Sequence, residues 1–85
     1  MSEETQSKIL ESVRRHAVEV LDCSPDEVVP EAHLSATLDM DSIDVIEVAT
    51  ALQSEYGVEL EDHEVYDLDT VQSLIDLVQA KLAKL

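Results

Sequence analysis

A serine stands at the start of a helix-forming segment, between two acidic residues. Asp41 precedes Ser42, and Asp44 follows it two positions later. Asp41 can accept the first backbone N–H groups of the helix, and Asp44 lies in the first turn, where negative charge is favoured. Many helices begin in this way. The four residues 41–44 alone therefore fit either an ordinary helix start or a serine with a functional hydroxyl.

A serine that acts as a nucleophile needs a base and an oxyanion hole. The three histidines, His16, His33 and His63, lie in different predicted elements, each among polar neighbours. None is placed to activate Ser42. A chain of 85 residues also leaves little room for a deep active site. The sequence therefore argues against a hydrolase, and we expect the protein not to be an enzyme.

The acidic residues before and after Ser42 were tested against the pattern of a calcium loop. Counting from Asp39, alternate ligands fall on Asp41 and then on Ile43, Asp44 takes the place of the glycine, and Thr50 takes that of the final glutamate. The pattern fails, so we predict no metal site beyond weak surface binding of divalent cations.

The lone Cys23 excludes a disulfide within the chain and a zinc site made of cysteines, and it fits a reducing compartment.

A serine that another enzyme modifies needs exposure, a loop before it and a docking surface after it. Successive residues of an α-helix are rotated by about 100° around its axis. In the predicted helix 42–56, this rotation places five residues on the side that faces the core: Val45, Val48, Ala49, Leu52 and Tyr56. We call these five residues the core stripe. Both isoleucines of the segment fall outside this stripe and are expected to be exposed. Carboxylates would orient a basic groove, and isoleucines would supply contact area. We therefore predict partner contacts at Asp41, Ile43, Asp44, Ile46, Glu47 and Thr50.

Charge limits the possible partners. The formal net charge is −15, and no Lys or Arg lies between residues 16 and 80, against seventeen Asp and Glu. Nucleic acid is excluded because its phosphates would be repelled. The acidity fits either solubility alone or the steering of basic partners. No segment approaches the roughly 20 apolar residues that a membrane span needs.

The predicted fold is all-α, a small four-helix bundle with a long loop between helices 1 and 2 and a short third helix. One glycine, two prolines and no Trp or Phe argue against tight hairpins. Ser2 or Thr5 would cap a first helix over 5–21, and Ser24 with Pro25 predicts one further turn. The other helices are predicted at 42–56, ended by Gly57, at 62–66, and from a cap at Asp69 or Thr70 to residue 82.

The long loop needs anchors, because a connection without its own secondary structure is uncommon at this length. Val28, Leu34 and Leu38 are predicted to reach the core from it. The chain begins with Met1 and shows neither a signal peptide nor a transit peptide. We therefore expect one domain over residues 1–85, whole, monomeric and cytoplasmic.

The chain resembles the acyl carrier proteins, which depend on phosphopantetheine. Asp41-Ser42-Ile43-Asp44 is similar to the Asp-Ser-Leu attachment motif of that family, and the likeness extends along nearly the whole chain. Its further positions are Asp26–Val28, Leu34, Leu38, Glu47, Leu52, Tyr56, Leu60, Leu68 and Thr70–Val71. The family's members are acidic four-helix bundles, so the resemblance agrees with the composition.

The resemblance implies that a phosphopantetheinyl transferase moves the arm of coenzyme A onto Ser42. The arm would carry acyl intermediates as thioesters to enzymes of fatty-acid, specialised lipid or polyketide synthesis. The sequence departs from the family where Asp39 replaces a usual glycine and Ile43 a usual leucine, which favours a dedicated pathway. An aminoacyl or peptidyl carrier, and an unmodified acidic adaptor that acts only by binding proteins, remain as alternatives.

Overall fold

Residues 3–85 fold into four α-helices and one short 3₁₀ helix. A computed structural model describes residues 3–85. The elements are α1 (Glu3–Leu21), η1 (Pro25–Glu27), α2 (Ser42–Tyr56), α3 (Asp62–Tyr66) and α4 (Val71–Leu82). This order confirms the all-α prediction, with its long loop before α2 and its short third helix.

The predicted helix ends are confirmed except at the start of α1. That helix begins at Glu3, so Thr5 lies inside it and is not its cap; Ser2 lies outside the described residues. Ser24 precedes η1 as its N-cap. At α2 the predicted bounds hold, and Gly57 ends the helix in the left-handed conformation, with φ of 66°. Thr70 caps α4, where its hydroxyl accepts the backbone N–H of Ser73 at 3.1 Å.

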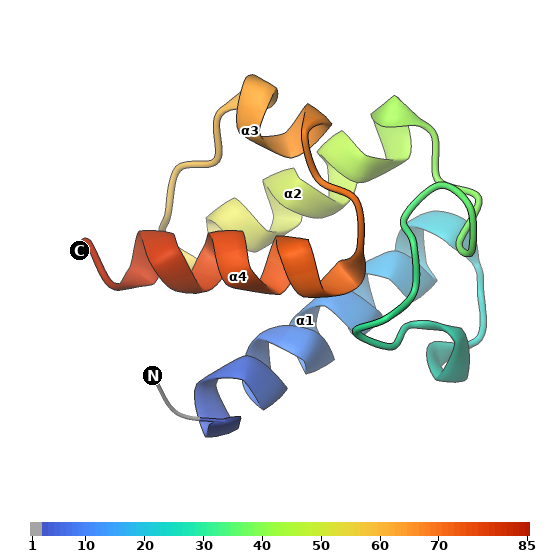
Figure 1. The fold of residues 1–85 in the computed structure, drawn as a ribbon, viewed down its shortest axis with the longest axis horizontal. Coiled ribbons are helices and arrows are strands. Elements are labelled where there is room, and N and C mark those ends of the chain that lie inside the picture. Colours follow the sequence, from blue (N-terminus) through green and yellow to red (C-terminus); the bar gives the residue numbers. More distant parts are fainter. Residues whose placement is uncertain (1–2) are drawn as a thin grey trace.

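Helix α1 packs against both α2 and α4, and α3 packs against α2 (Figure 1). The core between them is aliphatic, because the chain has no Phe or Trp to fill it. Its largest fully buried side chains are Ile9, Val13, Val28, Val48, Leu52, Val71, Leu74, Ile75 and Val78. Among residues 3–85, no helix is long and apolar enough to cross a membrane.

The loop between η1 and α2, teal to green in Figure 1, closes one end of the bundle. The predicted anchors Val28, Leu34 and Leu38 are all buried. Backbone hydrogen bonds also tie this loop to the start of α4. Leu34 N–H donates to the Asp69 carbonyl at 2.9 Å, and Val71 N–H donates to a loop carbonyl, that of Ala32, at 2.9 Å. The loop that leads to Ser42 therefore has a fixed path without regular structure of its own.

Arg14 ties the other end of the loop to α1. Its guanidinium donates from Nε to the Pro25 carbonyl at 3.1 Å and from Nη2 to the Val28 carbonyl at 3.0 Å. The same group pairs with Glu11 at 2.8 Å. One of the few cations of the chain is thus used inside the fold.

Candidate functional site

Ser42 is the first residue of α2, and it is exposed. Asp41 and Asp44 form a capping box around it. Asp44 N–H donates to Asp41 Oδ1 at 2.9 Å, and Asp41 N–H donates to Asp44 Oδ2 at 3.2 Å. This reciprocal pair fixes the first turn of the helix. The Ser42 hydroxyl has no hydrogen-bond partner among residues 3–85. It is therefore an unbonded hydroxyl on a backbone segment that the capping box holds in place.

No histidine of residues 3–85 bonds to Ser42. His16 Nε2 lies 2.8 Å from Glu55 Oε1, and His33 Nδ1 lies 3.2 Å from Asp69 Oδ1. His63 is exposed on α3. The serine therefore lacks the base that a nucleophilic serine requires, and its geometry fits a hydroxyl that another enzyme modifies.

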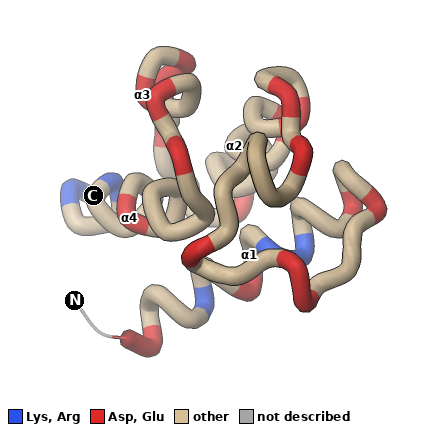
Figure 2. Tube along the Cα trace, turned by 45° about the vertical axis from the view of Figure 1, so that its right-hand side comes forward, with Lys and Arg blue, Asp and Glu red and all other residues tan. Residues whose placement is uncertain are grey.

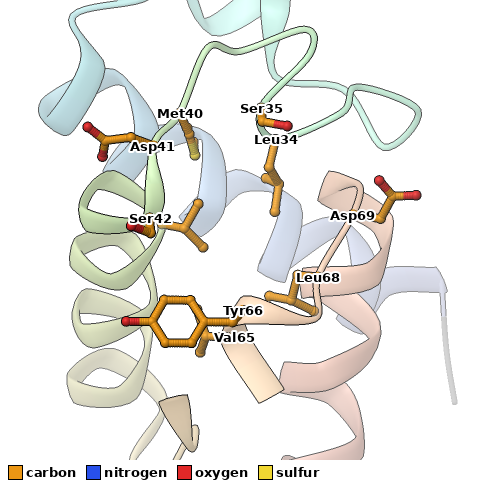
Figure 3. Close-up of a pocket in the computed structure, with 10 residues that line it drawn as sticks. Leu34, Ser35, Met40, Asp41, Ser42, Val65, Tyr66, Leu68 and Asp69 are labelled. Atoms are coloured by element: carbon orange, nitrogen blue, oxygen red, sulfur yellow. The ribbon is translucent and has the colours of Figure 1, made fainter. Parts of the chain in front are cut away.

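A cleft opens beside Ser42, between α2, α3 and the loop, and we call it the Ser42 cleft. Its volume is about 180 Å³. Figure 3 shows the side chains that line it; the aliphatic ones and Met40 are buried or half-buried, and the others are exposed at the rim. The apolar residues are Leu34, Met40, Val45, Val65 and Leu68, and the rim residues are Ser35, Asp41, Ser42, Tyr66 and Asp69.

The predicted partner-contact residues lie around the first two turns of α2, and we call them the docking face. They are Asp41, Ile43, Asp44, Ile46, Glu47 and Thr50. Ile43 is 66% exposed, and Asp41, Glu47 and Thr50 are exposed as well. Asp44 is half-buried beside its cap partner.

Ile46 corrects the prediction that both isoleucines are exposed. It is half-buried and packs against the core. The reason is helical geometry: Ile46 lies three residues before the buried Ala49, on the same side of α2. The docking face therefore presents one strongly exposed isoleucine, Ile43, at the position next to Ser42.

Negative charge dominates this part of the molecule. Figure 2 shows Asp and Glu positions along α2 and α3 as well as elsewhere in the chain, whereas Lys and Arg positions lie on α1 and toward the end of α4. Within residues 3–85, no ion pair includes Asp41, Asp44 or Glu47. No Lys, Arg or His of the described residues neutralises these carboxylates, so the start of α2 keeps a negative potential.

A second polar group, which the sequence analysis did not identify, joins α1 to α2. We call it the α1–α2 cluster. Glu55 accepts hydrogen bonds from Arg15 Nη2 at 2.6 Å and Ser12 Oγ at 2.9 Å, and the His16 contact adds to these. The pKa of Glu55 is lowered from 4.5 to about 2, and the hydrogen bond from Arg15 is the largest cause of this shift. Ser12 also lies 2.8 Å from the hydroxyl of Tyr56.

One signal for the α1–α2 cluster was present in the sequence. Ser12 interrupts an apolar stripe between Ile9 and Val13, and it is 3% exposed in the structure. A buried hydroxyl needs a partner, so this position indicated a polar contact inside the bundle. The partners lie some forty positions away in the chain and could not be identified from spacing.

Comparisons with known proteins agree with the geometry. A family model described as a phosphopantetheine attachment site matches residues 11–78, a range that includes Ser42. An acyl carrier protein of Thermosynechococcus vestitus is 42% identical over 78 residues, which span 92% of this chain and 96% of that protein. One from Petrotoga mobilis is 33% identical over 78 residues, 92% of each chain.

Solved structures show the same likeness. The crystal structure of an acyl carrier protein from Thermotoga maritima superposes with a TM-score of 0.86 at 27% identity, and the match covers 99% of this chain and 98% of that one. The solution structure of the acetyl actinorhodin acyl carrier protein from Streptomyces coelicolor gives a TM-score of 0.75 at 27% identity, covering 87% and 90%.

Proposed function

The chain belongs to the acyl carrier proteins, a family of non-catalytic carriers with a phosphopantetheine attachment site, and we propose that Ser42 is the residue that receives the arm. The observation that carries this proposal is the exposed hydroxyl at the first residue of α2, which has no hydrogen-bond partner within residues 3–85. Attachment there would break no contact of the fold.

The surroundings of Ser42 fit a covalently attached phosphopantetheine arm. The hydroxyl lies at the rim of the Ser42 cleft, whose interior is apolar and whose mouth is polar. When bound, the arm supplies a terminal thiol that holds an acyl group as a thioester. The residues of this chain hold the attachment point rigid through the capping box and leave space beside it.

The docking face is the surface through which such a carrier would bind its partner enzymes. The family implies a phosphopantetheinyl transferase and synthase enzymes. We propose that these enzymes bring basic surfaces to Asp41, Asp44 and Glu47, and that Ile43 supplies the apolar contact next to the reacting hydroxyl. The carboxylates would raise the association rate, and the isoleucine would slow dissociation.

We further propose that residues 1–85 form a single carrier domain that acts as a monomer. A net charge of −15 repels a second copy. The free thiol of Cys23 suits a reducing, cytoplasmic setting. The cargo is an intermediate of fatty-acid, specialised lipid or polyketide synthesis; the Streptomyces coelicolor relative is the actinorhodin carrier.

Intact mass spectrometry tests the assignment of Ser42. Incubation with coenzyme A and a phosphopantetheinyl transferase should add the mass of one phosphopantetheine to the protein. Ser42→Ala should gain nothing. Ser35→Ala is the matched control, because Ser35 is an exposed hydroxyl on the rim of the same cleft, and it should gain the full mass. A mass gain by Ser42→Ala, or none by the natural chain, would contradict the proposal.

A further inference from the structure

The two tyrosines are the only aromatic residues of the chain, and the fold uses only one of them. Tyr56 is half-buried against the core, and its hydroxyl donates to the Lys8 carbonyl at 3.3 Å and lies 2.8 Å from Ser12 Oγ. Tyr66, the last residue of α3, is 63% exposed. Its hydroxyl makes no hydrogen bond with any residue from 3 to 85. Stability of the bundle therefore does not explain an aromatic side chain at position 66.

Tyr66 lies close to the attachment serine although it belongs to another helix. Both residues line the Ser42 cleft, and Figure 3 shows Ser42 at the start of α2 and the tyrosine ring projecting from α3 toward α2. Ile43, which follows Ser42, is the other strongly exposed apolar residue here, at 66%. Two exposed side chains with large apolar surface, Ile43 on α2 and the Tyr66 ring on α3, thus lie near the site and offer contact area to a partner.

The charge around these two side chains restricts what can cover them. Neither α2 nor α3 contains a Lys or Arg. Exposed acidic residues are close in sequence to both side chains: Asp41 and Glu47 to Ile43, and Asp62 and Asp67 to Tyr66. A second copy of this chain or an anionic membrane would be repelled. The occupant must be a protein surface with an apolar recess inside a rim of Lys and Arg.

We propose that Tyr66 is an anchor for the phosphopantetheinyl transferase, so that the docking surface spans α2 and α3 across the Ser42 cleft. This inference rests on the proposed function, since it names a contact for the enzyme that modifies Ser42. The ring enters an apolar recess of the transferase, and the hydroxyl meets a polar group there. Tyrosine suits this role because it buries a large rigid area at a small cost in conformational entropy.

Steady-state kinetics of arm transfer from coenzyme A test the anchor. Tyr66→Ala should lower kcat/KM about tenfold, mainly through a higher KM, because it removes a central contact. Tyr66→Phe keeps the ring and should stay within about threefold of the natural chain. Val29→Ala is the control, because Val29 is also exposed, at 36%, but lies in the loop after η1 and does not line the Ser42 cleft.

The result separates the two proposals. Tyr66→Ala should melt at the same temperature as the natural chain, because the side chain is exposed, so a loss of rate cannot be attributed to unfolding. An unchanged kcat/KM in Tyr66→Ala, together with full modification at Ser42, would overturn the anchor and leave the proposed function intact. A natural chain that is never modified would overturn both.

Discussion

The two ends of α2 carry acidic residues that serve different purposes. Near its C-terminus, Glu55 accepts hydrogen bonds from Arg15 and Ser12 at 2.6 and 2.9 Å. Near its N-terminus, Asp41 and Asp44 accept hydrogen bonds from each other's backbone, and Glu47 is exposed. Within residues 3–85, one end of the helix thus has a carboxylate bonded to α1, and the other end has carboxylates that pair with no cation.

This difference follows from where the few cations lie. Arg14 and Arg15 are on α1 and are directed at η1, the loop and Glu55, while Lys81 on α4 pairs with Glu64 on α3 at 2.9 Å. None of them reaches the start of α2. Arg14, Arg15 and Lys81 therefore serve contacts within the fold, and the surroundings of Ser42 stay negative, which costs stability through repulsion and agrees with the proposed basic partners.

The largest effect is expected from reversing one unpaired charge. Glu47→Lys should lower kcat/KM for arm transfer about tenfold or more, because it places a cation against the basic rim of the transferase. Steady-state kinetics at low ionic strength measure it. Glu59→Lys makes the same change in net charge at an exposed position that follows the C-terminal end of α2, the opposite end from Ser42, and it should change the rate far less. Equal losses in the two variants would mean that only net charge matters.

The next effect concerns the paired carboxylate. Glu55→Gln should lower the free energy of unfolding at pH 7 by about 1–2 kcal/mol, because it weakens charged hydrogen bonds that are partly open to solvent. The folded pKa of Glu55 is about 2, below its ordinary 4.5. Its contribution is therefore complete above pH 4.5 and is lost as the pH falls toward 2.

Urea unfolding at a series of pH values measures this loss. The difference between the natural chain and Glu55→Gln should shrink steadily as the pH falls from 4.5 to 2. A difference that does not vary with pH across this range would show that the carboxylate charge contributes nothing to the α1–α2 cluster.

Salt should produce the smallest effect. About 1 M NaCl shortens the Debye length to about 3 Å and screens the unpaired carboxylates. The melting temperature should rise by about 5 °C, equivalent to roughly 1 kcal/mol for a domain of this size. A variant with Asp44→Asn and Glu47→Gln should show a smaller rise, because it has less repulsion to screen. A melting temperature that does not respond to salt would indicate that these charges do not repel one another appreciably.

The sequence predicts both ends of α2 well, because the signals there are local. The cap at Asp41, the acidic first turn at Asp44 and the left-handed Gly57 all lie within or beside the helix they delimit. The buried loop anchors were also predictable, since Leu34 and Leu38 are isolated apolar residues in a polar segment. These features needed no knowledge of how the helices pack.

The features that were missed depend on tertiary contacts. Ile46 was predicted to be exposed from its angle on the helical wheel, but it borders the buried face and packs against the core. The partners of Ser12 lie more than forty residues away. Tyr66 lies beside Ser42 only because the turn after α2 brings α3 back across the cleft. Periodicity places a residue on its own helix and does not say which other helix covers it.

The claim that the two ends of α2 have different functions is tested most directly by neutralising one carboxylate at each end. For both variants, kcat/KM for arm transfer and the free energy of unfolding are then measured. Glu47→Gln should lower kcat/KM for arm transfer severalfold and leave the free energy of unfolding unchanged or slightly higher. Glu55→Gln should lower the free energy of unfolding and leave kcat/KM unchanged. If both variants lose rate and stability together, the two regions are not distinct in function, and the account of the docking face is wrong.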